Sequence, residues 1–168
     1  MAFPIFYPPN HTMRLLHATV LFAAVACLSP AAQAQREKFS YDDLVYLEKT
    51  WPNAQKTNTG IRYVIQKPGQ GQPPKPGDMV HVLYVGTLLD GTPFDKNEDK
   101  DHPFTFRLGR GIVIQGWDQV LQLMKPGEKR LVIIPPELAY GSQGDAPKVP
   151  RDASLVFTIE LLGVDPEQ

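Results

Sequence analysis

The chain contains very little cysteine: Cys27 stands alone among 168 residues. A single cysteine excludes an intramolecular disulfide and a metal site built from several cysteines. The four histidines, His11, His17, His81 and His102, are not spaced as a pair of metal ligands, so we expect no metal ion. We likewise find no signature of a cofactor, and we expect a fold held together by packing.

The chain also lacks an excess of one charge, because the number of lysines and arginines, 17, is close to the number of aspartates and glutamates, 18. This balance gives no electrostatic footprint for nucleic acid, which we therefore do not expect as a partner. The length allows one domain with appendages. The 17 prolines and 13 glycines predict many turns and short strands, and few long helices.

Long hydrophobic runs are confined to the N-terminal segment. Leu15 to Leu28 is mostly apolar and uncharged, it follows Arg14, and it precedes Ala32-Gln33-Ala34, which fits a cleavage pattern for a secretory signal. The run is too short to span a membrane with ease. We therefore predict that residues 1–34 are a signal peptide, that the protein is exported, and that its mature form has no membrane span.

Several alternatives remain open for this segment. Translation starts at either Met1 or Met13, and the sequence does not decide between them. Lipid attachment at Cys27 is an alternative to free export, although Ala24-Val25-Ala26 matches the usual lipobox only weakly. The segment could also form a buried helix of the core.

Residues 35–58 form a polar lead-in. Ser40, followed three residues later by Asp43, predicts the start of a short helix, and Trp51-Pro52 predicts its end. Tyr46 and Trp51 either pack on the edge of the domain or dock a partner.

Short strands and one helix follow in residues 59–165. Residues 60–65 alternate between apolar and polar, residues 79–86 form a second strand, and Asp90-Gly91 predicts a hairpin. Trp117 begins the only clear helical pattern, whose apolar positions are Trp117, Val120, Leu121 and Met124. The pattern predicts an α+β fold, in which an antiparallel sheet wraps one short helix.

A series of motifs then keeps its order along residues 59–164. Each motif alone is weak, and together they are specific: Tyr84-Val85-Gly86, Asp90-Gly91, Phe94-Asp95, Phe104-Thr105-Phe106-Arg107-Leu108-Gly109, Val113-Ile114-Gln115-Gly116-Trp117, Leu138-Ala139-Tyr140-Gly141 and Leu155-Val156-Phe157. Taken jointly, they resemble the FKBP-type peptidyl-prolyl cis-trans isomerases. The resemblance implies the FKBP-like sheet around a helix and, given the N-terminal segment, a bacterial periplasmic location. Some exported members of this family carry a long helical dimerisation arm, for which the lead-in is far too short, so we expect a monomer.

The resemblance also implies a site: an aromatic cup with Trp117 as its floor. It assigns catalytic roles to Tyr84, Asp95, Ile114 and Tyr140, and substrate binding to Phe94, Phe104, Val113, Trp117 and Phe157. The implied ligands are proline-containing polypeptides and rapamycin-class macrolides. Read singly, the apolar members would be core residues, Asp95 a turn cap, and Tyr140 a local hydrogen-bonding group.

Three departures from the family pattern bear on specificity rather than on the fold. Lys100 stands where an arginine often pairs with Asp95, and lysine cannot make a bidentate contact. Asp145 and Ala146 replace a commoner His-Pro pair, and Lys148 replaces an apolar residue. Lys148 either favours acidic substrates at the rim or points to solvent.

Two functions fit these motifs. The first is an active isomerase that assists the folding of exported proteins. The second is a catalytically weak chaperone or partner-binding module that keeps the fold, and an assay on an X-Pro peptide separates the two.

Overall fold

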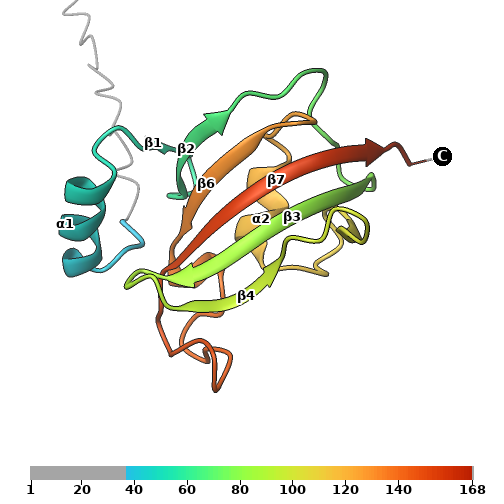
Figure 1. Ribbon diagram of the computed structural model, residues 1–168. Helices are drawn as coiled ribbons and strands as arrows, with labels where there is room; N and C mark the ends of the chain where they lie inside the picture. The colour runs from blue at the N-terminus through green and yellow to red at the C-terminus, as the bar shows by residue number, and fades with distance from the viewer. Residues whose placement is uncertain (1–36, 168) are drawn as a thin grey trace, which may run out of the picture. The chain divides into compact units, whose positions relative to one another are not determined.

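The computed structural model describes residues 37–167 (Figure 1). This part of the chain contains two α-helices, a short 3-10 helix and seven strands. In chain order they are α1 (Tyr41–Thr50), β1 (Gln55–Lys56), β2 (Arg62–Lys67), β3 (Met79–Leu88), β4 (Pro93–Asn97), β5 (Phe104–Arg107), α2 (Gln115–Leu121), β6 (Lys129–Ile134), η1 (Pro136–Leu138) and β7 (Leu155–Asp165). The predicted signal peptide and Cys27 lie outside the described residues.

The seven strands belong to one antiparallel sheet: six follow the order β1-β2-β6-β7-β3-β4, and β5 lies off this path, paired with β3. The long strand β3 pairs with β7 on one edge. Its other edge is shared, because its first half pairs with β5 and its second half with β4. Figure 1 shows α2 behind the sheet, across β7 and β3. The predicted α+β fold, with an antiparallel sheet around a short helix, is confirmed.

Alternation along the strands supplies the main core. Val80 and Val82 of β3 and Ile159 and Leu161 of β7 are fully buried, and in each strand they lie two residues apart. Such residues share one face of a sheet, here the face that packs against Leu121 of α2. A seven-residue helix is marginal alone, so this burial is what stabilises α2.

The opposite face of the sheet holds a second, smaller core. Leu47 of α1 is 1% exposed and packs in one cluster with Phe39, with Ile133 of β6 and with Val156 of β7. Ile133 and Val156 are register partners in the sheet. Trp51 is partly buried against this cluster and meets the ring of Tyr46 edge-on, with centroids 6.1 Å apart. The lead-in is therefore packed on the domain.

The helix α1 begins as the sequence predicted. The Ser40 hydroxyl accepts a hydrogen bond from the Asp43 N–H at 3.1 Å. Asp43 in turn accepts a 2.6 Å bond from the buried hydroxyl of Ser154, which precedes β7. The second of these bonds joins the first turn of α1 to the residue that precedes β7.

We expect Ser40→Ala to lower the free energy of unfolding by about 1 kcal/mol, because it removes the acceptor for a helix N-terminal N–H. Urea unfolding followed by far-UV circular dichroism measures the change. Ser142→Ala is the matched control, because Ser142 is exposed and lies in the loop before β7. Equal midpoints for the wild type and Ser40→Ala would contradict the capping role.

Two local expectations were imprecise. The helix α2 begins at Gln115, two residues before Trp117, and ends at Leu121, so Met124 lies three residues beyond its end. Met124 is nonetheless fully buried, as the helical pattern required.

Within residues 37–167, no helix is both long enough and apolar enough to cross a membrane.

Candidate active site

A cavity of about 390 Å³ opens between the inner face of the sheet and the N-terminal end of α2. Side chains from β3, β4, β5, β7 and α2 line it, together with the loops before α2 and after η1. The lining residues are Tyr84, Phe94, Asp95, Phe104, Gly111, Ile112, Val113, Ile114, Trp117, Tyr140 and Phe157. All nine residues that the resemblance assigned to the site are among them.

The indole of Trp117 forms the base of this cavity. It is 4% exposed, and the rings of Tyr84 and Phe157 meet it edge-on, with centroids 5.0 and 5.3 Å away. Phe104 and Phe106 lie within 6.2 Å on other sides. Edge-to-face contacts of this kind are favourable, and they fix the plane of the indole.

Two glycines allow these rings to come together. A Cβ at Gly116 would lie 2.5 Å from Ile134, so α2 could not sit this close to β6 with any other residue there. A Cβ at Gly86 would lie 2.7 Å from Phe157 and 2.9 Å from Phe94. The space above Gly86 is instead filled by these two rings, whose centroids are 5.5 Å apart.

The polar groups of the cavity are few and lie near one another. The Tyr84 hydroxyl donates to Asp95 Oδ2 at 2.7 Å, and Asp95 Oδ1 accepts from the Lys96 N–H at 2.9 Å. Burial, followed by the hydrogen bond to Asp95, raises the pKa of Tyr84 well above its ordinary value. Tyr84 is therefore a neutral hydroxyl, and its proton is directed at the carboxylate.

Tyr140 is the second hydroxyl at the cavity. Burial raises its pKa, and the negative charges of Asp145 and Asp95 raise it further. Within residues 37–167 its hydroxyl donates to no acceptor. The backbone N–H of Ile114 is also without an acceptor in this part of the chain. The cavity thus presents two free donors beside an apolar floor.

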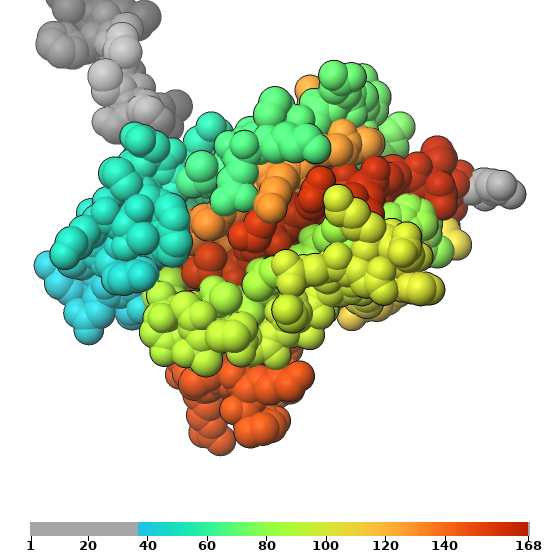
Figure 2. All heavy atoms as spheres, viewed as in Figure 1, coloured from blue at the N-terminus to red at the C-terminus, as the bar shows by residue number. Residues whose placement is uncertain are grey.

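The three departures from the family pattern have distinct places. Lys100 makes no ion pair with Asp95 in the described part of the chain, and it lines a different depression with Glu98 and Lys129. Lys148 is exposed and its ammonium pairs with no described carboxylate. Asp145 exchanges backbone hydrogen bonds with Val149, which closes the loop. Figure 2 shows the segment between η1 and β7 projecting from the body of the molecule.

Three residues of the site were missed from the sequence. Gly111 and Ile112 line the cavity, and Asp118 braces them, because its carboxylate accepts from the N–H groups of Gly109 at 2.8 Å and Gly111 at 3.3 Å. The available signal was an acidic residue in the first turn of a helix that follows two closely spaced glycines. Within residues 37–167, no group of acidic, histidine or cysteine side chains could hold a metal ion.

The chain thus forms a sheet wrapped around a short helix, with an aromatic cavity at the helix N-terminus, and the comparison with protein families identifies this arrangement. The model of the FKBP-type peptidyl-prolyl cis-trans isomerases matches residues 70–162. The chain belongs to this family.

Three relatives show the extent of the similarity. The chain is 52% identical over 89 residues to mouse peptidyl-prolyl cis-trans isomerase FKBP2, covering 53% of this chain and 64% of the relative. It is 40% identical over 107 residues to FK506-binding protein 1A of Aspergillus fumigatus, covering 63% of this chain and 96% of that protein. It is also 40% identical over 152 residues to Escherichia coli FkpA, covering 87% of this chain and 55% of FkpA. The crystal structure of FkpA superimposes with a TM-score of 0.67, over 76% of this chain and 59% of that one.

The chain therefore spans about two thirds of the length of FKBP2 and about half that of FkpA.

Proposed function

We propose that this protein is a peptidyl-prolyl cis-trans isomerase that accelerates rotation about X-Pro bonds during the folding of exported proteins. The observation that carries this proposal is the cavity itself: six aromatic side chains from separate parts of the chain line one hollow of about 390 Å³. The names of the relatives support it, since FKBP2 and FkpA are both called peptidyl-prolyl cis-trans isomerases.

The reaction explains why such a site is apolar. The barrier to rotation, roughly 18–20 kcal/mol, comes from amide resonance, which places partial negative charge on oxygen and partial positive charge on nitrogen. Rotation removes that resonance, so the transition state is less dipolar than the planar ground state. A dry cavity disfavours the planar form more than the rotated one, and this difference in binding accelerates the rotation.

Each of the nine site residues that the resemblance implied has a role in this account. The proline ring lies over Trp117, between Phe94, Phe104, Val113 and Phe157. The Ile114 N–H and the Tyr140 hydroxyl are the free donors, and they hold substrate carbonyls. Asp95 fixes the Tyr84 hydroxyl, at 2.7 Å, so that this polar group does not compete for the substrate. The mechanism forms no covalent intermediate, and the side chains transfer no proton.

The proposal is tested by following isomerisation of an X-Pro tetrapeptide by NMR exchange spectroscopy, with and without protein. We expect exchange that takes tens to hundreds of seconds uncatalysed to become much faster. Peptide that binds without any acceleration would instead support the chaperone or partner-binding module. Tyr140→Phe, which removes one donor and keeps the ring, is expected to reduce the rate while the fold persists.

The isomerase activity is expected to be constant from about pH 7 to pH 10, because free tyrosine titrates near 10 and both site hydroxyls titrate above that. A hydroxyl donates a hydrogen bond only while protonated, and a raised pKa keeps it protonated to higher pH. Activity should fall only above the ordinary tyrosine range. A decline centred below pH 9 that is absent in Tyr140→Phe would show that Tyr140 titrates lower than its surroundings indicate.

The partners follow from the same cavity. The protein binds proline-containing polypeptides, and a rapamycin-class macrolide fits an apolar hollow of this kind; the fungal relative is named for binding FK506. Competition between FK506 and the tetrapeptide tests whether both use the cavity. The ten-residue helix α1 packs on its own domain, in keeping with a monomer, which sedimentation can measure.

The location rests on residues 1–34, which lie outside the described residues. A signal peptide there places the mature protein in the bacterial periplasm, and lipid attachment at Cys27 is the alternative. Mass spectrometry of the mature N-terminus separates the two: cleavage after Ala34 gives a free protein, an acylated Cys27 gives an anchored one, and an intact segment refutes export by cleavage.

A further inference from the structure

Ile112 is unlike the other apolar side chains of the cavity. It lines the cavity yet is 60% exposed, whereas Trp117 and Phe157 are each 4% exposed. Among the described lining residues it is the one large hydrophobic side chain that is mostly in water. Its own fold gains little from it, so its apolar surface is available to a ligand.

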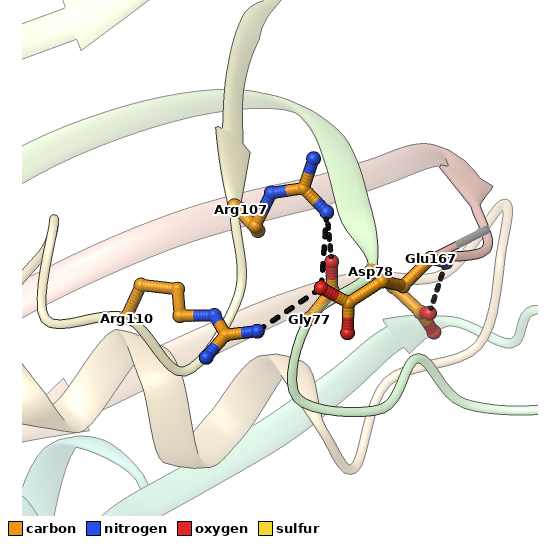
Figure 3. A network of polar contacts seen from close by, with 5 residues as sticks. All are labelled: Gly77, Asp78, Arg107, Arg110 and Glu167. Carbon is orange, nitrogen blue, oxygen red and sulfur yellow. Dashed lines mark hydrogen bonds and ion pairs between the residues drawn. The ribbon is translucent and has the colours of Figure 1, made fainter.

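The loop that carries Ile112 is held from two sides. On one side, Asp118 accepts the N–H groups of Gly109 and Gly111, both of which have positive φ, 71° and 67°. On the other side, Arg110 contacts Glu167 at 3.0 Å, and the Glu167 N–H donates to Asp78 at 3.0 Å. Figure 3 shows Arg110 and Arg107 converging on the Glu167 carboxylate. Ile112 is therefore presented at a fixed place on the rim.

The reaction indicates which substrate residue meets Ile112. The rotating bond joins the preceding residue to the proline nitrogen, so a carbonyl on that side must be free to turn. The Ile114 N–H is a fixed donor, so it can hold the carbonyl of the proline itself throughout the rotation more easily than the carbonyl that turns. Ile112 is two positions before Ile114, and two residues of extended chain span at most about 7 Å. Ile112 therefore lies close to the substrate residue that follows the proline carbonyl.

Resting on the proposed function, we propose that Ile112 determines specificity for the residue that follows the substrate proline. Ile112 favours a substrate with a large apolar side chain at that position, because this side chain packs on the exposed surface of Ile112 and both surfaces are removed from water. Asp118 is a positioning residue for this contact, because it holds the loop without reaching the substrate.

The test uses tetrapeptides that share one residue before proline and carry Leu, Ser, Lys or Glu after it. NMR exchange gives kcat/KM, and the shift of the Trp117 indole N–H during titration gives Kd without relying on catalysis. For the wild type we expect Leu to be preferred over Ser by about fivefold, from the burial of part of one side chain, with the effect in KM and Kd. In Ile112→Ser the ratio should fall to about one.

Two further variants sharpen the result. Ile112→Glu should introduce a selection among charged peptides, so that Lys is preferred over Glu. Leu123→Ser is the matched control, because Leu123 is 50% exposed but lies away from the cavity, and it should leave every ratio unchanged. Asp118→Ala should weaken binding of the Leu peptide more than that of the Ser peptide, and Asp118→Asn, which can still accept one N–H, should restore part of it.

An unchanged Leu-to-Ser ratio in Ile112→Ser would overturn the inference, whether or not the protein is catalytic. A second set of tetrapeptides varies the residue before proline. The inference would also be overturned if binding depended only on that residue and not on the one after proline. Peptides that bind with the expected ratios but are not isomerised would overturn the proposed function and support the role of Ile112.

Discussion

Replacing Trp117 with alanine is expected to lower the free energy of unfolding by about 3–5 kcal/mol and to remove most of the isomerase activity. The indole is 4% exposed and is in ring contact with Tyr84, Phe104, Phe106 and Phe157, so its removal leaves a large cavity among aromatic groups. It also deletes the surface on which the proline ring lies. Denaturant unfolding and NMR exchange measure the two losses separately.

Trp117→Phe is the matched control for this prediction. It keeps an aromatic floor and removes less volume, so it should retain more stability and more activity than the alanine variant. The two readouts also separate packing from catalysis. A Trp117→Ala protein that stays as stable as the wild type would contradict the buried position of the indole, and one that stays fully active would contradict its role beneath proline.

Replacing Asp95 with valine is expected to lower kcat/KM by about 10–100-fold, because a hydrogen bond to a charged group contributes about 1.5–3 kcal/mol. The carboxylate accepts the Tyr84 hydroxyl at 2.7 Å inside the cavity. Without it, a half-buried hydroxyl loses its partner and is free to turn toward the substrate. Valine has a similar shape, so the fold should persist, as unchanged near-UV circular dichroism would show.

Asp95→Asn distinguishes the hydrogen bond from the charge. Asparagine can still accept from Tyr84 but carries no charge, so a variant close to the wild type in activity would mean that the hydrogen bond is what matters. An asparagine variant as impaired as valine would mean that the negative charge acts on the substrate directly. Full activity in Asp95→Val would remove Asp95 from the site.

The sequence predicted the local elements because their signals are local. Ser40 is found at the start of α1, and Asp90-Gly91 lies in the turn between β3 and β4, where Gly91 has φ of 86°. The apolar spacing around Trp117 predicted the start of α2 to within two residues and its end to within three. The cavity is different, because Tyr84 and Phe157 are 73 positions apart in sequence and yet lie on the paired strands β3 and β7, with Phe157 opposite Gly86. Only the resemblance to a known family could bring them together.

Features that depend on tertiary contacts were not predicted. Arg130 and Glu128 are each 3% exposed, form an ion pair, and place the guanidinium 4.4 Å from the Tyr63 ring. Nothing in the alternation of β6 distinguishes this arginine from a surface one. The exposed Ile112 was missed for the converse reason, since the sequence does not distinguish an apolar residue at the rim of a cavity from one in the core.

The most direct measurement of the central claim changes the polarity of the cavity without changing its volume. Phe94 lines the cavity against Phe157, and leucine and asparagine at this position are similar in size. If a dry surrounding destabilises the planar X-Pro bond, the isomerisation rate measured by NMR exchange should remain within a few-fold of the wild type in Phe94→Leu and fall much further in Phe94→Asn. Equal rates in the two variants would contradict the account, because polarity in the cavity would then not matter to the rotation.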